Sequence, residues 1–388
     1  MGRGTTSMNS SATLTHRITR ATFGFLVAAF AIAAPAQTMS TAQPTAPTEK
    51  WPTKDNVYVI KNFKFGTGES HPELTLHYLT LGQPHRNAAG HVDNAILLLH
   101  GTGGDRHTLT NPVFSNVLFG PGQPFDITKY FLILPDDIGQ GDSSKPSDGL
   151  HMKFPQYDYD DMVRSQYIML TEGMHVDHLR LILGTSMGCM QSWVWGETYP
   201  TFMDGLAPFA CYPTELAGRN RMTRYIAITS IKNDPAWKNG DYTTPPVEGL
   251  RGAEAMLLVM GSAPLQMQKN YPTRAQAEKY VDDTMARTIA HTDANNLIYY
   301  VNASRNYNPE PKLSTIVAPA LWINSADDFI NPPELGEKII NDRVLPKMPK
   351  TKFILIPISD ATRGHGTHTV ATIWKQYLID FMAETEPK

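Results

Sequence analysis

The stretch that decides the fold is LRLILGTSMGCMQSWVWGETYP, residues 179–200. It begins with an apolar run at 179–184, which is typical of a buried strand, and it ends with a helical pattern of apolar residues. Between them lies Gly184-Thr185-Ser186-Met187-Gly188, a G-x-S-x-G sequence. In a strand–turn–helix setting, this sequence forms a sharp turn that presents the serine hydroxyl at the helix N-terminus. We therefore predict that Ser186 is a nucleophile.

Further apolar runs of strand length alternate with helical patterns along the chain. They lie at 95–100, 131–135, 320–325 and 352–358, and a helical pattern at 369–384 follows the last of them. Continuous apolar runs separated by helices favour an α/β fold with a parallel sheet covered on both faces. Two earlier runs, VYVIKNF and LTLHYLTLG, predict an antiparallel start to this sheet.

The alternation stops between residues 213 and 312. This region is rich in Met and Tyr, and it has helical patterns at 249–261 and 274–290. We predict a core formed by residues 51–212 and 313–388, with a helical lid at 213–312. The aromatic and Met side chains of the lid suggest an apolar acyl pocket, although Met at helical spacing is also typical of ordinary packing.

A serine nucleophile needs a base, and the base needs an acid that orients it. With the nucleophile on such a turn, the acid follows the next-to-last strand, where residues 324–332 read NSADDFINP. Asp328 fits the Asp-x-apolar-x-Pro form of that loop, and Asp327 is the runner-up. The alternative interpretation is that this pair of aspartates caps the helix that begins near Pro332.

The base is expected after the last strand. Residues 363–368 read RGHGTH and lie directly before the closing helix. A histidine that follows glycine on this loop can reach back over the serine, so we predict His365 as the base and His368 as the runner-up. His100 is expected to be structural and to brace the loop after its strand.

Acyl transfer also requires two hydrogen-bond donors for the oxyanion. The backbone N–H of Met187, directly after the predicted nucleophile, is one candidate. The other is the N–H of Thr102, within the stretch HGTGG that follows the apolar run at 95–100. The alternative interpretation is that HGTGG only forms a tight glycine turn.

The N-terminus has the features of an export signal. Arginines precede an apolar run at 21–34, and Ala34-Pro35-Ala36 has the small-x-small form of a signal-peptidase site. We predict a signal peptide at 1–36 that is cut after Ala36, a flexible linker at 37–50, and a periplasmic or secreted location. The alternative is an N-terminal membrane anchor, for which the run is short and rich in alanine.

Composition limits the partners and cofactors. The 388 residues are 41% hydrophobic and 18% charged, with a formal net charge of −3. This composition supports a buried core and argues against nucleic acid as a partner. After signal removal no stable membrane insertion is expected, and no metal or other cofactor is expected either. The only cysteines are Cys189 and Cys211, whose pairing is left open. We interpret Cys189 as a small packing residue rather than a reactive thiol.

Several stretches resemble the homoserine O-acetyltransferase-like branch of the α/β-hydrolase superfamily. They are GPGQPFDITKYFLILPD (120–136), DMVRSQ (161–166), GTSMGCMQSWVWGETYP (184–200), DPAWKNGDY (234–242) with PPVEGL (245–250), and DANNLIYYVNASRNY (293–307). The resemblance implies an α/β-hydrolase fold with a mostly parallel central sheet. It also implies a Ser186–Asp328–His365 triad, a covalent acyl-enzyme, no metal, and often a homodimer formed through the lids.

The chain departs from the acetyltransferases of that branch at two places. They have an acidic residue directly after the catalytic histidine, which reads the amino group of homoserine, whereas this chain has Gly366. Their Gly-Ser-Cys-x-Gly-Ser type loop is replaced by DDIGQGDSSKP at 136–146, a form that resembles esterases. We therefore predict an exported serine hydrolase that cleaves an ester or related small acyl compound. The alternatives are an acyltransferase with a different acceptor and a non-catalytic binding protein of the same fold.

Overall fold

The computed structural model describes residues 51–386, which lie within one compact unit. The predicted signal peptide at 1–36 and linker at 37–50 lie outside the described residues. Across residues 51–386, no helix has the length and apolar character needed to span a membrane.

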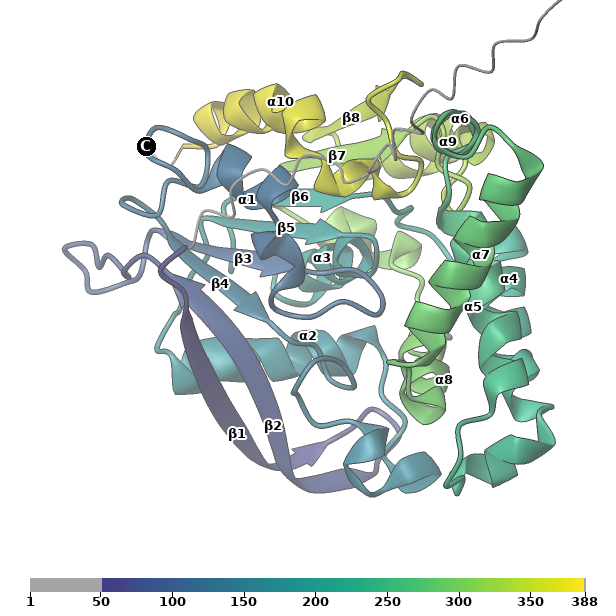
Figure 1. The fold of residues 1–388 in the computed structure, drawn as a ribbon. Coiled ribbons are helices and arrows are strands. Elements are labelled where there is room, and N and C mark those ends of the chain that lie inside the picture. Colours follow the sequence, from purple (N-terminus) through teal and green to yellow (C-terminus); the bar gives the residue numbers. More distant parts are fainter. Residues whose placement is uncertain (1–50, 387–388) are drawn as a thin grey trace, which may run out of the picture. The chain divides into compact units, whose positions relative to one another are not determined.

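An eight-stranded sheet runs through the centre of this unit (Figure 1). Its strands lie in the order β1-β2-β4-β3-β5-β6-β7-β8. β1 pairs with β2 and β2 pairs with β4 in antiparallel fashion, and the remaining pairs are parallel, as the apolar runs predict. The strands are β1 (Lys54–Lys64), β2 (Ser70–Leu81), β3 (Ala95–Leu99), β4 (Phe131–Pro135), β5 (Leu181–Thr185), β6 (Leu206–Phe209), β7 (Ala320–Ser325) and β8 (Thr351–Ile356).

Alternate side chains of the central strands enter two separate cores. Leu97 of β3 packs in one core with residues of α2 and α3, whereas its neighbour Ile96 packs in the other with residues of α1 and α10. Because helices cover both faces, every residue of β3 is buried and the strand is apolar throughout. The helices of the core outside the lid region are α1 (Pro112–Leu118), α2 (Tyr159–Ile168), α3 (Met187–Thr198), α9 (Pro333–Ile339) and α10 (Ala371–Glu384).

Five helices lie between β6 and β7, in the region predicted as a lid. They surround a small core of their own that includes Ile231, Leu250 and Leu297. Figure 1 shows α4, α5, α7 and α8 together beyond the arrowheads of the parallel strands, which is where α/β sheets bind ligands. The five are α4 (Gly218–Lys232), α5 (Val247–Gly261), α6 (Pro264–Asn270), α7 (Arg274–Ile289) and α8 (Ala294–Asn302).

The last strand differs from the expectation of a buried run at 352–358. β8 ends at Ile356 and lies at the edge of the sheet beside β7. Ile356 is buried, but Leu355 is 40% exposed. Hydrophobic content predicts a strand here, but it does not reveal that the strand has a neighbour on one side only.

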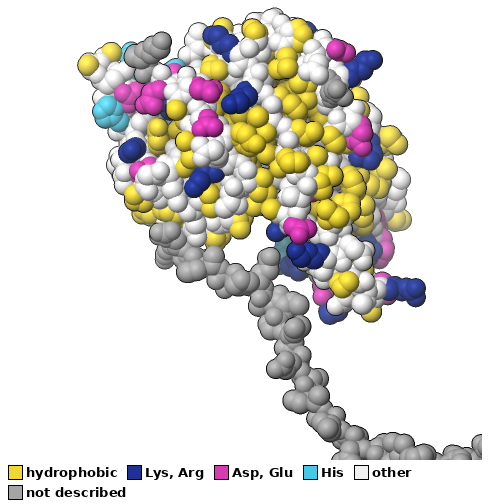
Figure 2. Space-filling view, turned by 90° about the horizontal axis from the view of Figure 1, so that it is seen from above, with side chains coloured by type: hydrophobic (Ala, Val, Ile, Leu, Met, Phe, Trp, Pro, Cys, Tyr) yellow, Lys and Arg dark blue, Asp and Glu magenta, His cyan; other side chains and the backbone are white. Residues whose placement is uncertain are grey.

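Several large apolar side chains of the lid face solvent. Met222, Tyr225, Val259, Leu265 and Val281 are between 42% and 62% exposed. Figure 2, which views the structure from above, also shows apolar side chains gathered over a broad part of that face. Exposed apolar patches commonly mark contact surfaces. The homodimer implied by the resemblance stays a prediction.

Candidate active site

Ser186 lies at the turn between β5 and α3 with backbone angles of φ 54° and ψ −108°. Positive φ is unusual for a residue with a side chain and marks local strain. The turn needs both flanking glycines, because a Cβ on Gly184 would lie 2.0 Å from the Gly188 carbonyl oxygen. A Cβ on Gly188 would lie 2.3 Å from the Leu99 carbonyl oxygen. The strand–turn–helix arrangement predicted around the G-x-S-x-G sequence is therefore present.

Ser186, His365 and Asp328 form one chain of hydrogen bonds. The Ser186 Oγ lies 2.8 Å from His365 Nε2, and His365 Nδ1 lies 2.8 Å from Asp328 Oδ2. When Nδ1–H donates to the carboxylate, Nε2 carries a lone pair that accepts the serine proton. The structure thus brings together three residues from the loops after β5, β7 and β8.

Asp328 is fully buried, and backbone amides hold its carboxylate. The N–H groups of Ile330 and Asn331 donate to Oδ1 at 2.8 and 3.0 Å. Burial by itself would raise the pKa of this carboxyl. The charge and hydrogen bond of His365, together with the two amides, outweigh burial and hold the pKa below its ordinary value. Asp328 is therefore ionised at neutral pH, and its carboxylate accepts a hydrogen bond from His365.

The runner-up acid, Asp327, does not contact the imidazole of His365. Its carboxylate accepts hydrogen bonds from Ser325 Oγ at 2.5 Å, Thr362 Oγ1 at 2.8 Å and the Gly364 N–H at 3.0 Å. It therefore braces the loop that carries His365. Within residues 51–386 neither aspartate accepts a hydrogen bond from α9, so the alternative of a helix-capping pair is wrong.

The runner-up base, His368, packs against His365 rather than against Ser186. The two rings meet edge to face with centroids 5.1 Å apart. Burial, followed by the charge of His365, lowers the pKa of His368 to about 3, although Asp328 acts in the opposite direction. The ring is therefore neutral at physiological pH.

The Thr102 and Met187 amides, predicted to bind an oxyanion, both remain available. Within the described part of the chain neither donates to a protein acceptor, whereas the Gly103 N–H donates to Gln140 Oε1 at 2.7 Å. His100 braces this loop as predicted, because its Nδ1 lies 2.8 Å from the Gly101 carbonyl oxygen. HGTGG does form a tight turn, because the Gly104 N–H donates to the Gly101 carbonyl oxygen at 3.0 Å and Gly103 has φ 74°. The turn also lies against the predicted nucleophile, since an added Cβ on Gly101 would lie 3.3 Å from the Ser186 Cβ.

A cavity of about 380 Å³ opens onto Ser186 and His365 between the core and the lid. Its wall is mainly apolar, as the Met and Tyr content of the lid suggests, with Leu257, Met260 and Tyr300 among its apolar side chains, and it also contains the charged side chains of Arg224 and Glu254. Other apolar residues of the lid, such as Met222 and Val259, point to solvent at 62% exposure each. The lid residues that line the cavity are Asn220, Thr223, Arg224, Glu254, Leu257, Met260, Gly261, Thr288, Thr292, Tyr300 and Val301.

Comparison with known proteins identifies the family. The family model of the alpha/beta hydrolase fold matches residues 94–357. The chain belongs to the α/β-hydrolase fold family. It is 28% identical to homoserine O-acetyltransferase of Geotalea uraniireducens over 69% of this chain and 80% of that protein. It is also 28% identical to a probable acyltransferase of Methanothermobacter thermautotrophicus, over 84% of this chain and 96% of that protein.

Solved structures of other α/β-hydrolases share the fold. The homoserine O-acetyltransferase from Bacillus anthracis has a TM-score of 0.74 at 22% identity, covering 85% of this chain and 97% of that one. The acetyl esterase MekB has a TM-score of 0.71 at 24% identity, covering 86% and 96%. The resemblance to the homoserine O-acetyltransferase-like branch is confirmed. The chain is an enzyme that acts on acyl bonds or transfers acyl groups.

This α/β-hydrolase has two charged side chains in its cavity wall that the sequence reasoning missed. Arg224 is 7% exposed and donates to Asn220 Oδ1 at 3.0 Å and to the Val301 carbonyl oxygen at 3.2 Å. Glu254 is 9% exposed and accepts from Thr292 Oγ1 at 3.1 Å, and burial raises its pKa. Neither forms an ion pair with another side chain among residues 51–386. A bound ligand that places an opposite charge beside one of these side chains would offset the free-energy cost of burying it.

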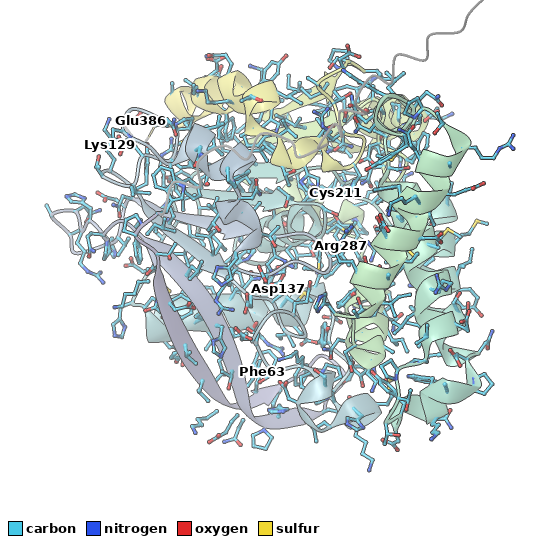
Figure 3. All side chains as sticks on the ribbon, viewed as in Figure 1. Phe63, Lys129, Asp137, Cys211, Arg287 and Glu386 are labelled. Carbon is cyan, nitrogen blue, oxygen red and sulfur yellow. A yellow bond between two sulfur atoms is a disulfide. The ribbon has the colours of Figure 1, made fainter. Side chains whose placement is uncertain are left out.

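Cys189 and Cys211 form a disulfide between the first turn of α3 and the end of β6. Their Cα atoms are 5.9 Å apart, and both residues are fully buried. Cys189 is therefore a buried residue of the core, as interpreted, and the pairing that the sequence left open is a disulfide to Cys211. Figure 3 shows Cys211 and Asp137 in the interior, whereas Lys129 and Glu386 lie at the end of the α/β-hydrolase body away from the lid.

The hydrogen-bonded chain predicts how Ser186 responds to a fluorophosphonate probe, which reacts with activated serine hydroxyls. Intact-mass spectrometry over time should show one label on the wild-type protein and none on Ser186→Ala. His365→Gln should slow labelling by about 10²–10⁴-fold because the base is lost. His368→Asn should label close to the wild-type rate. Equal labelling of Ser186→Ala and wild type would contradict the role of Ser186.

Proposed function

We propose that this protein is a serine hydrolase that cleaves a small ester or related acyl compound through an acyl-enzyme on Ser186. The observation that carries the proposal is the Ser186–His365–Asp328 chain beside two backbone amides that have no acceptor within residues 51–386. Asp328 orients the imidazole and offsets its positive charge in the transition state. The pair of amides gives the developing oxyanion its hydrogen bonds.

The reaction divides into two steps at this site. First, Ser186 Oγ attacks the carbonyl carbon while His365 Nε2 takes the serine proton, and the tetrahedral oxyanion hydrogen-bonds to the Thr102 and Met187 N–H groups. His365 then gives that proton to the leaving alcohol, and the acyl-enzyme remains. In the second step His365 removes a proton from water, which attacks the acyl carbon, and the proton returns to Ser186 as the acid leaves.

Hydrolysis is favoured over acetylation of homoserine by the residue after the base. Gly366 has no side chain, so no carboxylate at that position reads an amino group. The esterase E22 also shares the fold, with a TM-score of 0.74 at 20% identity over 85% of this chain and 100% of that one. Esterase activity on this fold therefore agrees with the esterase-like loop at 136–146 and with glycine in place of an acidic residue at position 366.

The second candidate is acyl transfer to an acceptor other than homoserine. Two observations favour it: the similarity to acetyltransferases described above, and the ionisable side chains of Arg224 and Glu254 in the cavity, which have no ionic partner in the described part of the chain. An acceptor bearing a complementary charge would be held near Ser186 by these side chains. Transfer also requires that the acceptor outcompete water for the acyl-enzyme.

Partition of the acyl group distinguishes the two candidates. Purified protein is mixed with an activated acetyl ester and either glycerol or an amino alcohol, and products are followed by chromatography. Free acetate should account for nearly all of the acyl group released, because Gly366 has no side chain to hold the amino group of the acceptor and water is present at far higher concentration than either acceptor. Predominant acylation of the acceptor would replace hydrolysis by transfer. Ser186→Ala is the control and should form neither product above background.

Charge in the cavity predicts a preference among esters of equal size. Arg224 should favour an ester that bears a carboxylate over its neutral methylamide counterpart, because the buried guanidinium has no ionic partner among the residues that the structure describes. Arg224→Met should lower kcat/KM for the anionic ester by about 30-fold, equivalent to about 2 kcal/mol, and leave the neutral ester nearly unchanged. The matched control is Lys232→Met, an exposed cation on the same helix and outside the cavity wall. An equal loss of kcat/KM for the anionic and the neutral ester would contradict recognition of the carboxylate by Arg224.

We also propose that the protein is exported through the predicted signal peptide. The Cys189–Cys211 disulfide supports this, because disulfides persist in oxidising compartments and are rare in the cytosol. After expression in a bacterial host, N-terminal sequencing of the periplasmic or secreted protein should begin at Gln37. Recovery of the chain only in the cytosol with an intact N-terminus would contradict export.

A further inference from the structure

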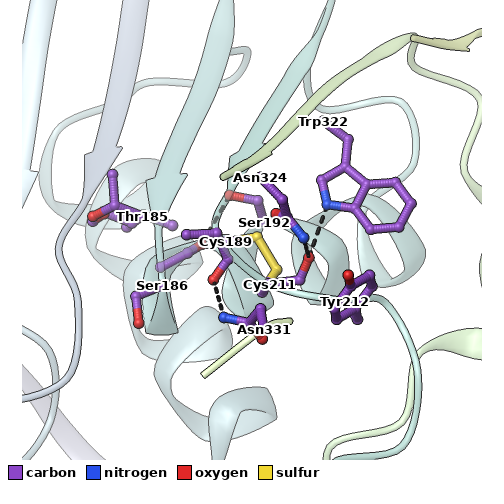
Figure 4. The surroundings of a disulfide bond; sticks show 12 residues. Thr185, Ser186, Cys189, Ser192, Cys211, Tyr212, Trp322, Asn324 and Asn331 are labelled. Atoms are coloured by element: carbon purple, nitrogen blue, oxygen red, sulfur yellow. Dashed lines mark hydrogen bonds between the residues drawn. A yellow bond between two sulfur atoms is a disulfide. The ribbon is translucent and has the colours of Figure 1, made fainter. Parts of the chain in front are cut away.

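The segment Phe209–Cys211, at the end of β6, contacts both the turn that carries Ser186 and the loop that carries Asp328. The Phe209 carbonyl oxygen accepts from the Ser186 N–H at 2.8 Å. The Ala210 carbonyl oxygen accepts from Asn331 Nδ2 at 2.8 Å (Figure 4). One short segment therefore joins two loops that are distant in sequence.

Asn331 also contacts the carboxylate of Asp328. Its backbone N–H donates to Asp328 Oδ1 at 3.0 Å, and its side-chain amide lies 3.4 Å from Asp328 Oδ2. The same Oδ2 faces His365 Nδ1 at 2.8 Å. Because Asn331 is only 3% exposed, its side chain has little freedom to rotate. A shift of Ala210 would therefore turn the carboxylate that orients the imidazole.

The far end of the segment is fixed from two sides. Cys211 is bonded to Cys189, in the first turn of α3, one turn beyond Ser186 (Figure 4). The Cys211 carbonyl oxygen also accepts from Trp322 Nε1 at 2.8 Å and from Asn324 Nδ2 at 3.3 Å. Both donors lie on β7, the strand that leads to Asp328. The disulfide thus links α3, which begins directly after Ser186, to Cys211, which is hydrogen-bonded to the strand that precedes Asp328.

The backbone of the segment is strained. Ala210 has φ 65°, a left-handed conformation that costs free energy for a residue with a Cβ. Its N–H donates to the Ile323 carbonyl oxygen at 2.8 Å, which holds it in place. Such a conformation persists only where surrounding contacts over-determine it. The disulfide is one of these contacts, and its removal would let the segment relax.

We propose that Phe209–Cys211, cross-linked to α3 by the disulfide, is a positioning element that sets Ser186 in register with Asp328. This inference rests on the proposed function of the Ser186–His365–Asp328 chain. A displacement of about 1 Å in a catalytic group can lower a rate by about 10²-fold. Cys189, Cys211 and Asn331 do not line the cavity, so their removal should change kcat rather than KM.

The test breaks each link separately and then both together. Cys189→Ala with Cys211→Ala removes the cross-link, and Asn331→Ala removes the hydrogen-bonded link to Ala210. Each change should lower kcat for an ester substrate about tenfold and leave KM within about twofold. The combined variant should lose much less than the product of the two effects, because both links act through the same segment. The matched control is Val194→Ala, a buried position on α3 without a link to the segment, which should lower the melting temperature and leave kcat unchanged.

Two results would overturn the inference. One is an unchanged kcat in folded Cys189→Ala/Cys211→Ala protein that only melts at a lower temperature, because the disulfide would then be purely structural. The other is a multiplicative loss in the combined variant. If the cysteine variant does not fold by circular dichroism, Asn331→Ala keeps the disulfide and decides on its own kcat and KM. Ser186→Ala distinguishes failure of the proposed function from failure of the positioning role. Full activity of Ser186→Ala would overturn the proposed function. An inactive Ser186→Ala, together with fully active Cys189→Ala/Cys211→Ala and Asn331→Ala, would overturn only the positioning role.

Discussion

The sharp turn at Ser186 is the constraint on which the rest of the site depends. A strand must end, reverse direction and begin a helix within a few residues, and only glycine fits at positions 184 and 188. The turn places Oγ 2.8 Å from His365 Nε2, and it leaves the Met187 N–H without an acceptor in the described part of the chain. Everything that contributes to the site, from the Thr102 loop to the lid, lies around this point at the carboxyl ends of the parallel strands.

Buried polar networks hold the loops around that turn. Asp137 is fully buried beside His100 and accepts from Gln166 Nε2 at 2.6 Å and Gln191 Nε2 at 2.7 Å. Burial raises the pKa of this carboxyl, and the nearby His100 and the two amide side chains offset part of that rise. Gln140 joins the two candidate oxyanion loops, because it accepts from the Gly103 N–H and donates to Met187 Sδ at 3.3 Å. A fully satisfied network of this kind fixes one arrangement of its loops.

The lid determines which molecules reach the serine. Its helices bury Arg224 and Glu254 in the cavity wall without ionic partners among residues 51–386, and the proposed preference for charged esters rests on this burial. The same helices leave Met222 and Tyr225 more than 60% exposed on the outside.

Local sequence was sufficient for the parts of the protein that depend on neighbouring residues. The G-x-S-x-G turn, the apolar strands, the lid helices at α5 and α7, and the preference for Asp328 and His365 over Asp327 and His368 all follow from short patterns, because the backbone geometry of a turn or strand is set within a few residues. Tertiary structure alone decided the disulfide, the edge position of β8 and the inward face of the lid. Cys189 meets Cys211, and Asn331 meets Ala210, only after distant strands have paired, and the face that a helix buries depends on what packs against it. Such contacts join residues from distant parts of the chain, so no local pattern in the sequence records them.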